Sequence, residues 1–191
     1  MTKKSLNDFK HILCGIMDNA ADESANLLHA SWVKTPLGPM IAIANEKSLF
    51  LLEFADWRGL TKEILCLRKA THSVILPGKS APLTSIRNEL EHYFSGKLKS
   101  FKTPLRKVGT DFQNRVWAAT KKIPYGQTRS YYDIAMVLGK PTAFHAVANA
   151  NGKNKFAIVI PCHRVINHNG GMGGYGGGIA RKKWLITHEL S

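Results

Sequence analysis

One short apolar run most restricts how this chain folds. Ile158–Ile160 ends at Pro161, and Cys162 and His163 follow at once. An apolar run bounded by a proline predicts a buried β-strand. Because proline has no N–H to donate to a neighbouring strand, we expect the strand to stop at Pro161. Cys162 then lies at the mouth of a site and not deep within a sheet.

Cys162 and His163 together form a candidate thiolate site. Positive neighbours lower the pKa of a cysteine thiol, and this chain carries a formal net charge of +14. The alternative is a buried structural cysteine, because free cysteines are among the most buried residues. Adjacency of the two residues alone favours that alternative, so the decision depends on the sequence around them.

The positive charge is concentrated in the second half of the chain. Residues 106–191 contain 13 Lys/Arg and 3 Asp/Glu, a net charge of +10, whereas residues 1–105 contain 14 and 10, a net charge of +4. Lysine and arginine on phosphates supply most sequence-independent affinity for nucleic acids. The half with Cys162 is therefore suited to a polyanion, with general solubility charge as the alternative.

The cysteine motif Pro161-Cys162-His163-Arg164-Val165 belongs to a series of motifs in this half. The others are Gly109-Thr110-Asp111-Phe112-Gln113 with Val116-Trp117, Ile123-Pro124-Tyr125-Gly126, Ser130-Tyr131, Gly139-Lys140-Pro141, Ala146-Val147-Ala148, Asn154, Gly173, Tyr175, Gly177-Gly178, Trp184-Leu185 and His188-Glu189. Together they resemble the O6-alkylguanine-DNA alkyltransferase family, almost without gaps from Gly109 to Glu189. The first half is similar only loosely, through Thr35-Pro36-Leu37-Gly38 and the strand-like segments after it.

The resemblance implies both a function and a fold. Members of this family repair duplex DNA by moving the alkyl group of O6-alkylguanine, and of O4-alkylthymine, onto their own cysteine, irreversibly and once per molecule. The implied fold is α+β, with a ribonuclease-H-like N-terminal domain made of a small sheet and helices. The C-terminal domain is expected to be mostly helical and winged-helix-like, with a helix-turn-helix, and the protein to be a monomer.

Three segments are expected along the chain. Residues 1–30 form an N-terminal extension, either with a short amphipathic helix over residues 5–18 or as a tail. Residues 31–105 form an α/β domain, and residues 106–191 the DNA-binding and alkyl-transfer domain. Within residues 31–105 we expect strands at Trp32–Lys34, Met40–Ala44 and Leu49–Phe54, helices at residues 61–70 and 83–95, and a linker at Lys97–Lys107.

Short helices are expected in the C-terminal half. Capping patterns mark two helix starts, Thr110 with Gln113 and, more weakly, Ser130 with Asp133. Gly139 ends the second of these helices, and another follows at about Ala143–Ala150. Two short helices joined by a tight, glycine-containing turn match a helix-turn-helix, although many helical hairpins bind nothing.

The helix at Ala143–Ala150 is thin and has almost no long polar side chain to read base edges in a major groove. Small residues permit close approach to a minor groove, which carries little sequence information. Tight internal packing competes evenly with this interpretation, and the resemblance favours the minor groove. The expected DNA-binding residues are Ala143, Phe144, His145 and Ala148, with Tyr132 and Lys140.

The expected chemistry is displacement at a saturated carbon, on a nucleotide flipped out of the stack. Cys162 is the nucleophile, and His163 takes the thiol proton directly or through one water. The resemblance implies that Glu189 orients the imidazole, as in catalytic triads, and that Asn154 braces the active-site turn. The alternatives are that Glu189 is a solvated glutamate near the C-terminus and that Asn154 is an ordinary loop asparagine. The product is a thioether, whose thiolate is a poor leaving group, and no device for hydrolysing it is evident, so each molecule is expected to act once. No cofactor and no metal are expected.

The lesion base is expected to meet a second set of residues. The resemblance places Tyr131 where a tyrosine supplies a hydrogen bond to the leaving guanine; a half-buried aromatic at a helix start is the alternative. Residues 170–178 are rich in glycine, which lets the backbone approach a flat ligand closely. Gly176 and Gly177 are therefore expected in the pocket wall, with Tyr175 as its lid. The alternative is that residues 170–178 are a flexible loop. Backbone groups of Cys162 and Val165 are expected to recognise the guanine edge.

Three positions depart from the family pattern. His145 stands where the family usually has an arginine that fills the space left by the flipped base, and arginine is always charged whereas histidine is not. Gly176 replaces a small hydroxyl residue, so one contact to the lesion is missing. Ala157 stands where some members carry proline, which bears on tolerance of bulky alkyl groups.

Two other functions compete with repair. A non-catalytic lesion sensor resembling the alkyltransferase-like proteins is disfavoured by Cys162, which those proteins generally replace, but His145 keeps it open. A thiol hydrolase has only Cys162 and His163 in its favour. The three cysteines, Cys14, Cys66 and Cys162, suggest no disulfide framework or zinc-finger spacing. With no clear secretory signal, we expect the cytoplasm of a prokaryote or the nucleus of a eukaryote.

Overall fold

The structure, a computed structural model, describes residues 26–191. The helix expected over residues 5–18 lies outside the described residues. The chain divides into two compact units: the described residues up to Leu90 with Thr103–Val108 form the first, and Glu91–Lys102 with Gly109–Ser191 form the second. Within residues 26–191, no helix has the length and apolar character needed to cross a bilayer.

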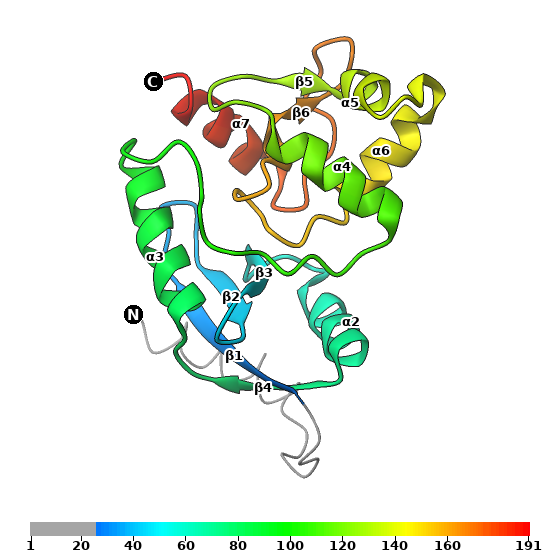
Figure 1. The fold of residues 1–191 in the computed structure, drawn as a ribbon. Coiled ribbons are helices and arrows are strands. Elements are labelled where there is room, and N and C mark those ends of the chain that lie inside the picture. The colour runs from blue at the N-terminus through cyan, green and yellow to red at the C-terminus, as the bar shows by residue number, and fades with distance from the viewer. Residues whose placement is uncertain (1–25) are drawn as a thin grey trace. The chain divides into compact units, whose positions relative to one another are not determined.

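A four-stranded sheet forms the centre of the first unit (Figure 1). β2 pairs antiparallel with both β1 and β3, whereas β4 runs parallel to β1, so the order is β3-β2-β1-β4. β1 begins at Asn26 and not at Trp32, so residues 26–30, expected in the extension, belong to the sheet. The strands are β1 (Asn26–Val33), β2 (Met40–Ala44), β3 (Leu49–Phe54) and β4 (Ser73–Pro77).

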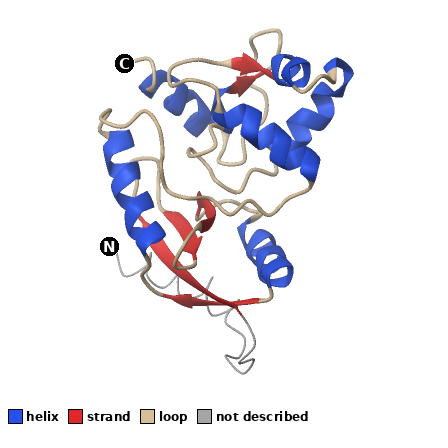
Figure 2. Ribbon diagram, viewed as in Figure 1, coloured by secondary structure: helices blue, strands red, loops and turns tan. Residues whose placement is uncertain are grey.

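Two helices cover this sheet. α2 (Leu60–Thr71) and α3 (Ala81–Phe94) lie on opposite faces (Figures 1 and 2). α2 places Leu60, Ile64 and Leu67 in one cluster with strand residues that include Ile41 and Ile43. Because both faces are covered, every residue of β2 and β3 is buried, which explains why these strands read as continuous apolar runs. β4 follows α2 directly and is a strand that the sequence analysis missed.

The segment expected to be a linker, Lys97–Lys107, is divided between the units. Its second part pairs with the sheet, because the N–H of Leu49 donates to the carbonyl of Pro104 at 2.8 Å and the N–H of Arg106 donates to the carbonyl of Leu49 at 2.8 Å. The Thr103 hydroxyl donates to Glu89 of α3 at 2.7 Å. Residues 103–108 are therefore part of the first unit's structure and not a free connection.

The second unit is mostly helical, as expected for the C-terminal half of an α+β chain. Its short strands β5 (Arg129–Ser130) and β6 (Val165–Ile166) pair in parallel. Gly139, in the left-handed region at φ 68°, lies in the turn between α5 and the 3-10 helix η1. The helices are α4 (Asp111–Lys121), α5 (Tyr131–Val137), η1 (Pro141–Ala143), α6 (Phe144–Asn151), the 3-10 helix η2 (Cys162–Arg164) and α7 (Ile179–His188).

Both predicted capping boxes are confirmed. The Thr110 hydroxyl accepts from the N–H of Gln113 at 3.3 Å, and the Gln113 side chain accepts from the N–H of Thr110 at 2.9 Å. Ser130 and Asp133 exchange the equivalent bonds at 3.0 and 2.8 Å. Each box satisfies two N–H groups that have no partner within the helix, so α4 and α5 begin where these side chains stand.

The prediction of a strand at Ile158–Ile160 is wrong, because these residues form a buried turn. Ile158 has φ 72°, a left-handed conformation that is rare for a β-branched residue. The N–H groups of Val159 and Ile160 donate to the carbonyls of Ala157 and Phe156, each at 2.9 Å, so the turn needs no partner strand. An apolar run indicates burial, but it does not distinguish a strand from a buried turn.

Replacing Thr110 by alanine removes the hydroxyl that accepts from Gln113 at the start of α4. We expect Thr110→Ala to lower the free energy of unfolding by about 1 kcal/mol. Thr110→Ser keeps a capping hydroxyl and should remain close to wild type. Urea unfolding followed by circular dichroism measures both, and equal midpoints for Thr110→Ala and wild type would contradict the capping role.

Candidate active site

Cys162 lies at the start of η2, partly exposed, in the wall of a cavity of about 740 Å³. Tyr131 from α5 and Tyr175 from the glycine-rich loop (residues 170–178) line the same cavity. A volume of this size suits a small, flat ligand. The predicted nucleophile therefore faces a space that can hold a nucleobase.

Asn154 holds the turn that carries Cys162. Its side-chain amide donates to the carbonyl of Ile160 at 2.9 Å, to that of Phe156 at 3.3 Å and to Cys162 Sγ at 3.2 Å. Its oxygen accepts from the N–H of Phe156 at 3.0 Å. One buried side chain thus satisfies the buried turn and places a hydrogen-bond donor at the sulfur, where it favours the thiolate.

His163 and Glu189 form a buried pair behind Cys162. Nε2 of His163 lies 2.8 Å from Oε1 of Glu189, and neither side chain is more than marginally exposed. Burial lowers the pKa of His163, although the Glu189 carboxylate opposes this effect. Nδ1 of His163 is buried and has no hydrogen-bond partner among the described residues. The carboxylate therefore orients the ring and leaves Nδ1 available for a proton.

Arg164 is a site residue that sequence reasoning missed. Its guanidinium donates to both carboxylate oxygens of Glu189, from Nε at 2.7 Å and from Nη2 at 2.9 Å, and its Nη1 donates to the carbonyl of Ile123 at 2.6 Å. Burial alone would raise the pKa of Glu189, but the hydrogen bonds from His163 and Arg164 outweigh it and hold that pKa well below its usual range. Glu189 thus stays ionised.

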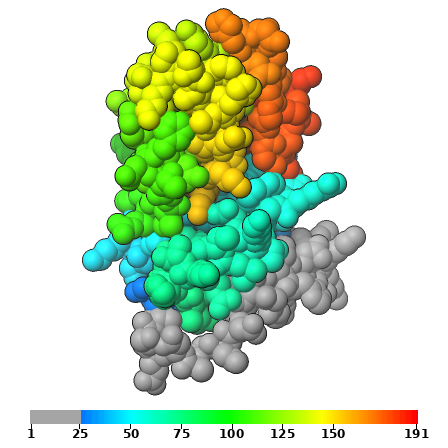
Figure 3. Space-filling model, turned by 90° about the vertical axis from the view of Figure 1, so that its right-hand side faces the viewer, coloured from blue at the N-terminus to red at the C-terminus, as the bar shows by residue number. Residues whose placement is uncertain are grey.

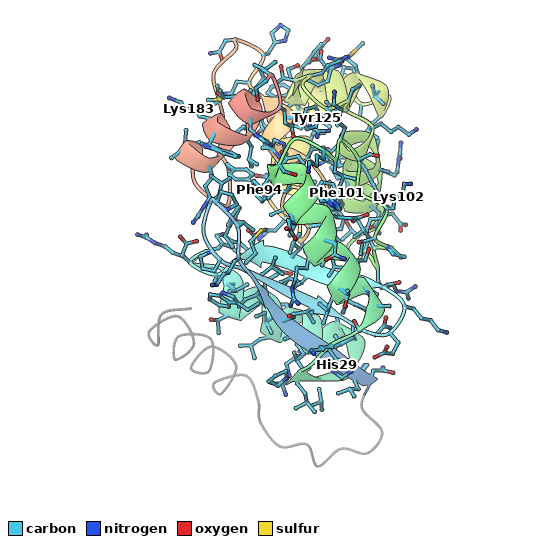
Figure 4. All side chains as sticks on the ribbon, turned by 90° about the vertical axis from the view of Figure 1, so that its left-hand side faces the viewer. His29, Phe94, Phe101, Lys102, Tyr125 and Lys183 are labelled. Atoms are coloured by element: carbon cyan, nitrogen blue, oxygen red, sulfur yellow. The ribbon has the colours of Figure 1, made fainter. Side chains whose placement is uncertain are left out.

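Tyr93, at the end of α3, also binds this carboxylate. Its hydroxyl donates to Oε1 of Glu189 at 2.6 Å, and burial together with that carboxylate raises the pKa of Tyr93, so it remains a donor. Tyr93 packs among aromatic rings that include Phe94, Phe101 and Tyr125, which lie near one another in Figure 4. No local pattern in the sequence links Tyr93 with Glu189.

Lys182 of α7 is a second buried cation that sequence reasoning missed. Its ammonium donates to the carbonyl of Val165 at 2.6 Å, and to those of Met172 and Gly174. Burial lowers the pKa of Lys182 to about 8, and the nearby Cys162 opposes this effect. Lys182 therefore ties β6 to the glycine-rich loop and places a positive charge near the sulfur. Lys182 lies three positions before the buried Leu185, so both are on one face of α7, and this spacing could have indicated that Lys182 is buried. In the sequence, however, Lys182 stands within Arg181–Lys183, a basic run that is typical of a surface.

The predicted base-binding residues have different surroundings. Burial and Cys162 raise the pKa of Tyr131, so its hydroxyl stays protonated beside the cavity. Gly173 is left-handed, at φ 64°, and a Cβ there would lie 3.0 Å from the Tyr131 ring, so only glycine fits. Gly176 lines the cavity. Gly177 is not among its lining residues, and its carbonyl accepts from Arg181 at 3.0 Å.

The carbonyls expected to recognise the guanine edge already accept bonds within the protein. That of Cys162 accepts from the N–H of Val165, and that of Val165 accepts from Lys182. The Cys162 carbonyl also accepts from the Asn151 side-chain amide at 3.5 Å. A carbonyl oxygen has two lone pairs, so the Val165 carbonyl can still accept one bond from a ligand, whereas a ligand at the Cys162 carbonyl must replace one of its present donors.

The expected DNA-binding residues divide into two groups. Tyr132, Phe144, His145 and Ala148 line the exposed part of the cavity, together with His168. Ala143 and Lys140 are not among the lining residues, and the Lys140 ammonium lies 5.9 Å from the centre of the Phe112 ring. Figure 3 shows the yellow surface of the segment with α6 between the green surface of α4 and the orange surface of the segment before α7. Within the described residues, no group of three or more His, Cys, Asp or Glu side chains could hold a metal ion.

Comparison with known proteins gives consistent matches over both halves. Residues 28–106 match the ribonuclease-like domain of 6-O-methylguanine DNA methyltransferase, and residues 111–191 match its DNA-binding domain. The methylated-DNA–protein-cysteine methyltransferase of Methanosarcina barkeri is 41% identical, with 82% of this chain and 94% of that protein covered. The protein of the same name from Mycobacterium tuberculosis is 41% identical, with 86% and 94% covered.

Solved structures match in the same way. The crystal structure of Mycobacterium tuberculosis O6-methylguanine methyltransferase has a TM-score of 0.73 and 39% identity, covering 85% of this chain and 93% of that one. The structure of Mycobacterium tuberculosis OGT in complex with DNA has a TM-score of 0.71 and 38% identity, covering 86% of this chain and 93% of that one. These matches confirm the expected α+β fold, with a small sheet domain followed by a helical domain.

Removing the Arg164 guanidinium leaves the Glu189 carboxylate buried without its bidentate partner. We expect Arg164→Met to lower the free energy of unfolding by about 3–5 kcal/mol. Arg129 is the matched control, because it is exposed and its guanidinium donates to its near neighbours Gln127 and Thr128. Urea unfolding of both variants measures the difference, and similar losses for Arg129→Met and Arg164→Met would contradict the buried network.

The same network sets the response of the wild type to acid. The folded pKa of Glu189 is depressed, so its contribution to stability is present above the ordinary value of 4.5 and is lost as the pH falls below it. Arg164→Met should therefore lose less of its remaining stability than the wild type between pH 5 and 3, in the same unfolding assay.

Proposed function

The chain belongs to the 6-O-methylguanine DNA methyltransferase family, and on that premise we propose that it repairs DNA by moving the alkyl group of O6-alkylguanine, and of O4-alkylthymine, onto Cys162. The observation that most directly supports this function is a cysteine in the wall of a cavity large enough for a nucleobase, with a buried histidine–carboxylate pair beside it. The names of the relatives and the DNA complex of one of them support the same activity.

In the proposed reaction, the Cys162 thiol loses its proton to Nδ1 of His163 through one water. Glu189 holds Nε2 and stabilises the imidazolium, while Asn154 and Lys182 stabilise the thiolate. The low pKa of Glu189 keeps the proton on the imidazole and off the carboxylate.

The thiolate then attacks the alkyl carbon in line with the bond to O6. The S–C bond forms as the C–O6 bond breaks, and the electron pair stays on the oxygen. The Tyr131 hydroxyl, kept protonated by burial, donates a hydrogen bond to the departing guanine. The proton held by His163 then restores neutral guanine. Because a thioether does not readily release its alkyl group, each protein molecule acts once.

Access to the alkylated base requires that the nucleotide leave the stack, since an enzyme cannot reach its target atom inside a duplex. We propose that the exposed part of the cavity, with Tyr132, His145 and Ala148, contacts the minor groove. The +10 charge of residues 106–191 supports phosphate binding in any sequence. The protein would then act where the DNA is, in the cytoplasm of a prokaryote or the nucleus of a eukaryote.

The test is the intact mass of the protein after mixing with a duplex that carries one O6-methylguanine. We expect a gain of one methyl group per molecule in the wild type and none in Cys162→Ser. Tight binding of the lesion without a mass gain would support a non-catalytic sensor instead. Repeated release of product by one protein molecule would support a hydrolase.

His145 offers a second test, because it stands where the family resemblance expects an arginine. Arginine is charged at every working pH and can donate two parallel hydrogen bonds to a phosphate. We expect His145→Arg to raise DNA affinity or the repair rate by about threefold to tenfold, because it adds a permanent positive charge at the expected DNA-binding surface. Fluorescence anisotropy and single-turnover kinetics measure these quantities. Equal binding and equal repair by both proteins from pH 6 to 8 would contradict the prediction.

A further inference from the structure

The N-terminal end of α6 carries two adjacent rings that reach solvent. Phe144 is 40% exposed, and its ring centre lies 4.3 Å from that of the neighbouring, exposed His145, with the ring planes tilted by 39°. A single exposed apolar ring is common on protein surfaces, but this one also lines the cavity that contains Cys162.

One face of α6 explains why this pair stands out. Phe144, Ala148 and Gly152 follow one another at steps of four, and all three line the cavity. Ala148 and Gly152 add almost no bulk to that face. Along this row the surface is therefore low at Ala148 and Gly152 and rises to an apolar ring at Phe144, while Asn149 and Asn151 line the cavity beside it.

The same cavity connects this end to the reactive sulfur. Its lining includes the partly buried Cys162 and Tyr131 and the exposed Phe144, His145 and Tyr132. The exposed rings and the Cys162 sulfur therefore line one continuous cavity. The Tyr132 ring, on α5, packs edge-on against His168 at 5.5 Å, and Phe144 is the exposed apolar ring at the start of α6.

We propose that Phe144 is a wedge: its ring enters the base stack of the duplex, occupies the space that the flipped nucleotide leaves, and is braced by His145. Apolar side chains, including phenylalanine, unstack base steps in this way when proteins bind the minor groove. A ring stacks on any base, so the wedge needs no particular sequence. The inference rests on the proposed function, because it names the residue that opens the duplex at that site.

The test compares transfer from a duplex with transfer from a free base. O6-benzylguanine as a free base needs no unstacking, whereas O6-methylguanine in a duplex does. We expect Phe144→Ala to lower the ratio of duplex to free-base transfer rates by about tenfold, the loss of one stacked ring. Met136→Ala is the matched control, because Met136 is 52% exposed on α5 and is not among the cavity-lining residues. It should keep the wild-type ratio.

A second readout does not depend on the chemistry. The fluorescent base 2-aminopurine, placed beside the lesion, brightens when it loses its stacking partner. In a Cys162→Ser background, binding should brighten the probe, and adding Phe144→Ala should remove most of that increase at saturating protein. Phe144→Leu should retain part of it, since leucine is also an apolar wedge.

Each outcome separates the two proposals. An unchanged ratio and unchanged brightening in Phe144→Ala would overturn the wedge, and so would equal losses on both substrates, which would indicate a role in the pocket itself. A wild-type protein that alkylates Cys162 with neither substrate would overturn the proposed function, while the fluorescence assay would still decide the wedge.

Discussion

The rest of the second unit depends on the hydrogen bonds to the buried Glu189 carboxylate. It is buried two residues from the end of the sequence, and it accepts hydrogen bonds from Tyr93, Gly126, His163 and Arg164. These donors come from the end of α3, the turn after α4, and η2. A buried carboxylate is unfavourable unless it is fully paired, so these segments must meet in one arrangement for the charge to be tolerated.

That arrangement determines the chemistry of Cys162. Glu189 stays ionised and orients His163, whose Nδ1 is left to take a proton, while Asn154 donates to the sulfur. Lys182 adds a buried positive charge near the sulfur and joins β6 to the glycine-rich loop. The groups that favour the thiolate are thus the same groups that hold the cavity wall in place, so stability and reactivity share one network.

The cavity wall depends on small residues in the same way. Gly173 leaves room for the Tyr131 ring, and Ala148 and Gly152 keep one face of α6 low. Phe144 and His145 place two rings at the start of α6, and both line the same cavity. The proposed repair of lesions in any sequence needs close approach and stacking more than base-edge hydrogen bonds, and a surface of this kind suits that proposal.

The sequence by itself determined the features that depend on near neighbours. The capping boxes at Thr110 and Ser130 join residues three positions apart, β2 and β3 read as apolar runs, and the motif around Cys162 identified the family. Only the tertiary structure decided the turn at Ile158–Ile160 and the roles of Tyr93, Arg164 and Lys182. Tyr93 lies 96 positions from Glu189 and Lys182 lies 17 from Val165. A buried charge is defined by partners that folding brings together, and no local pattern names those partners.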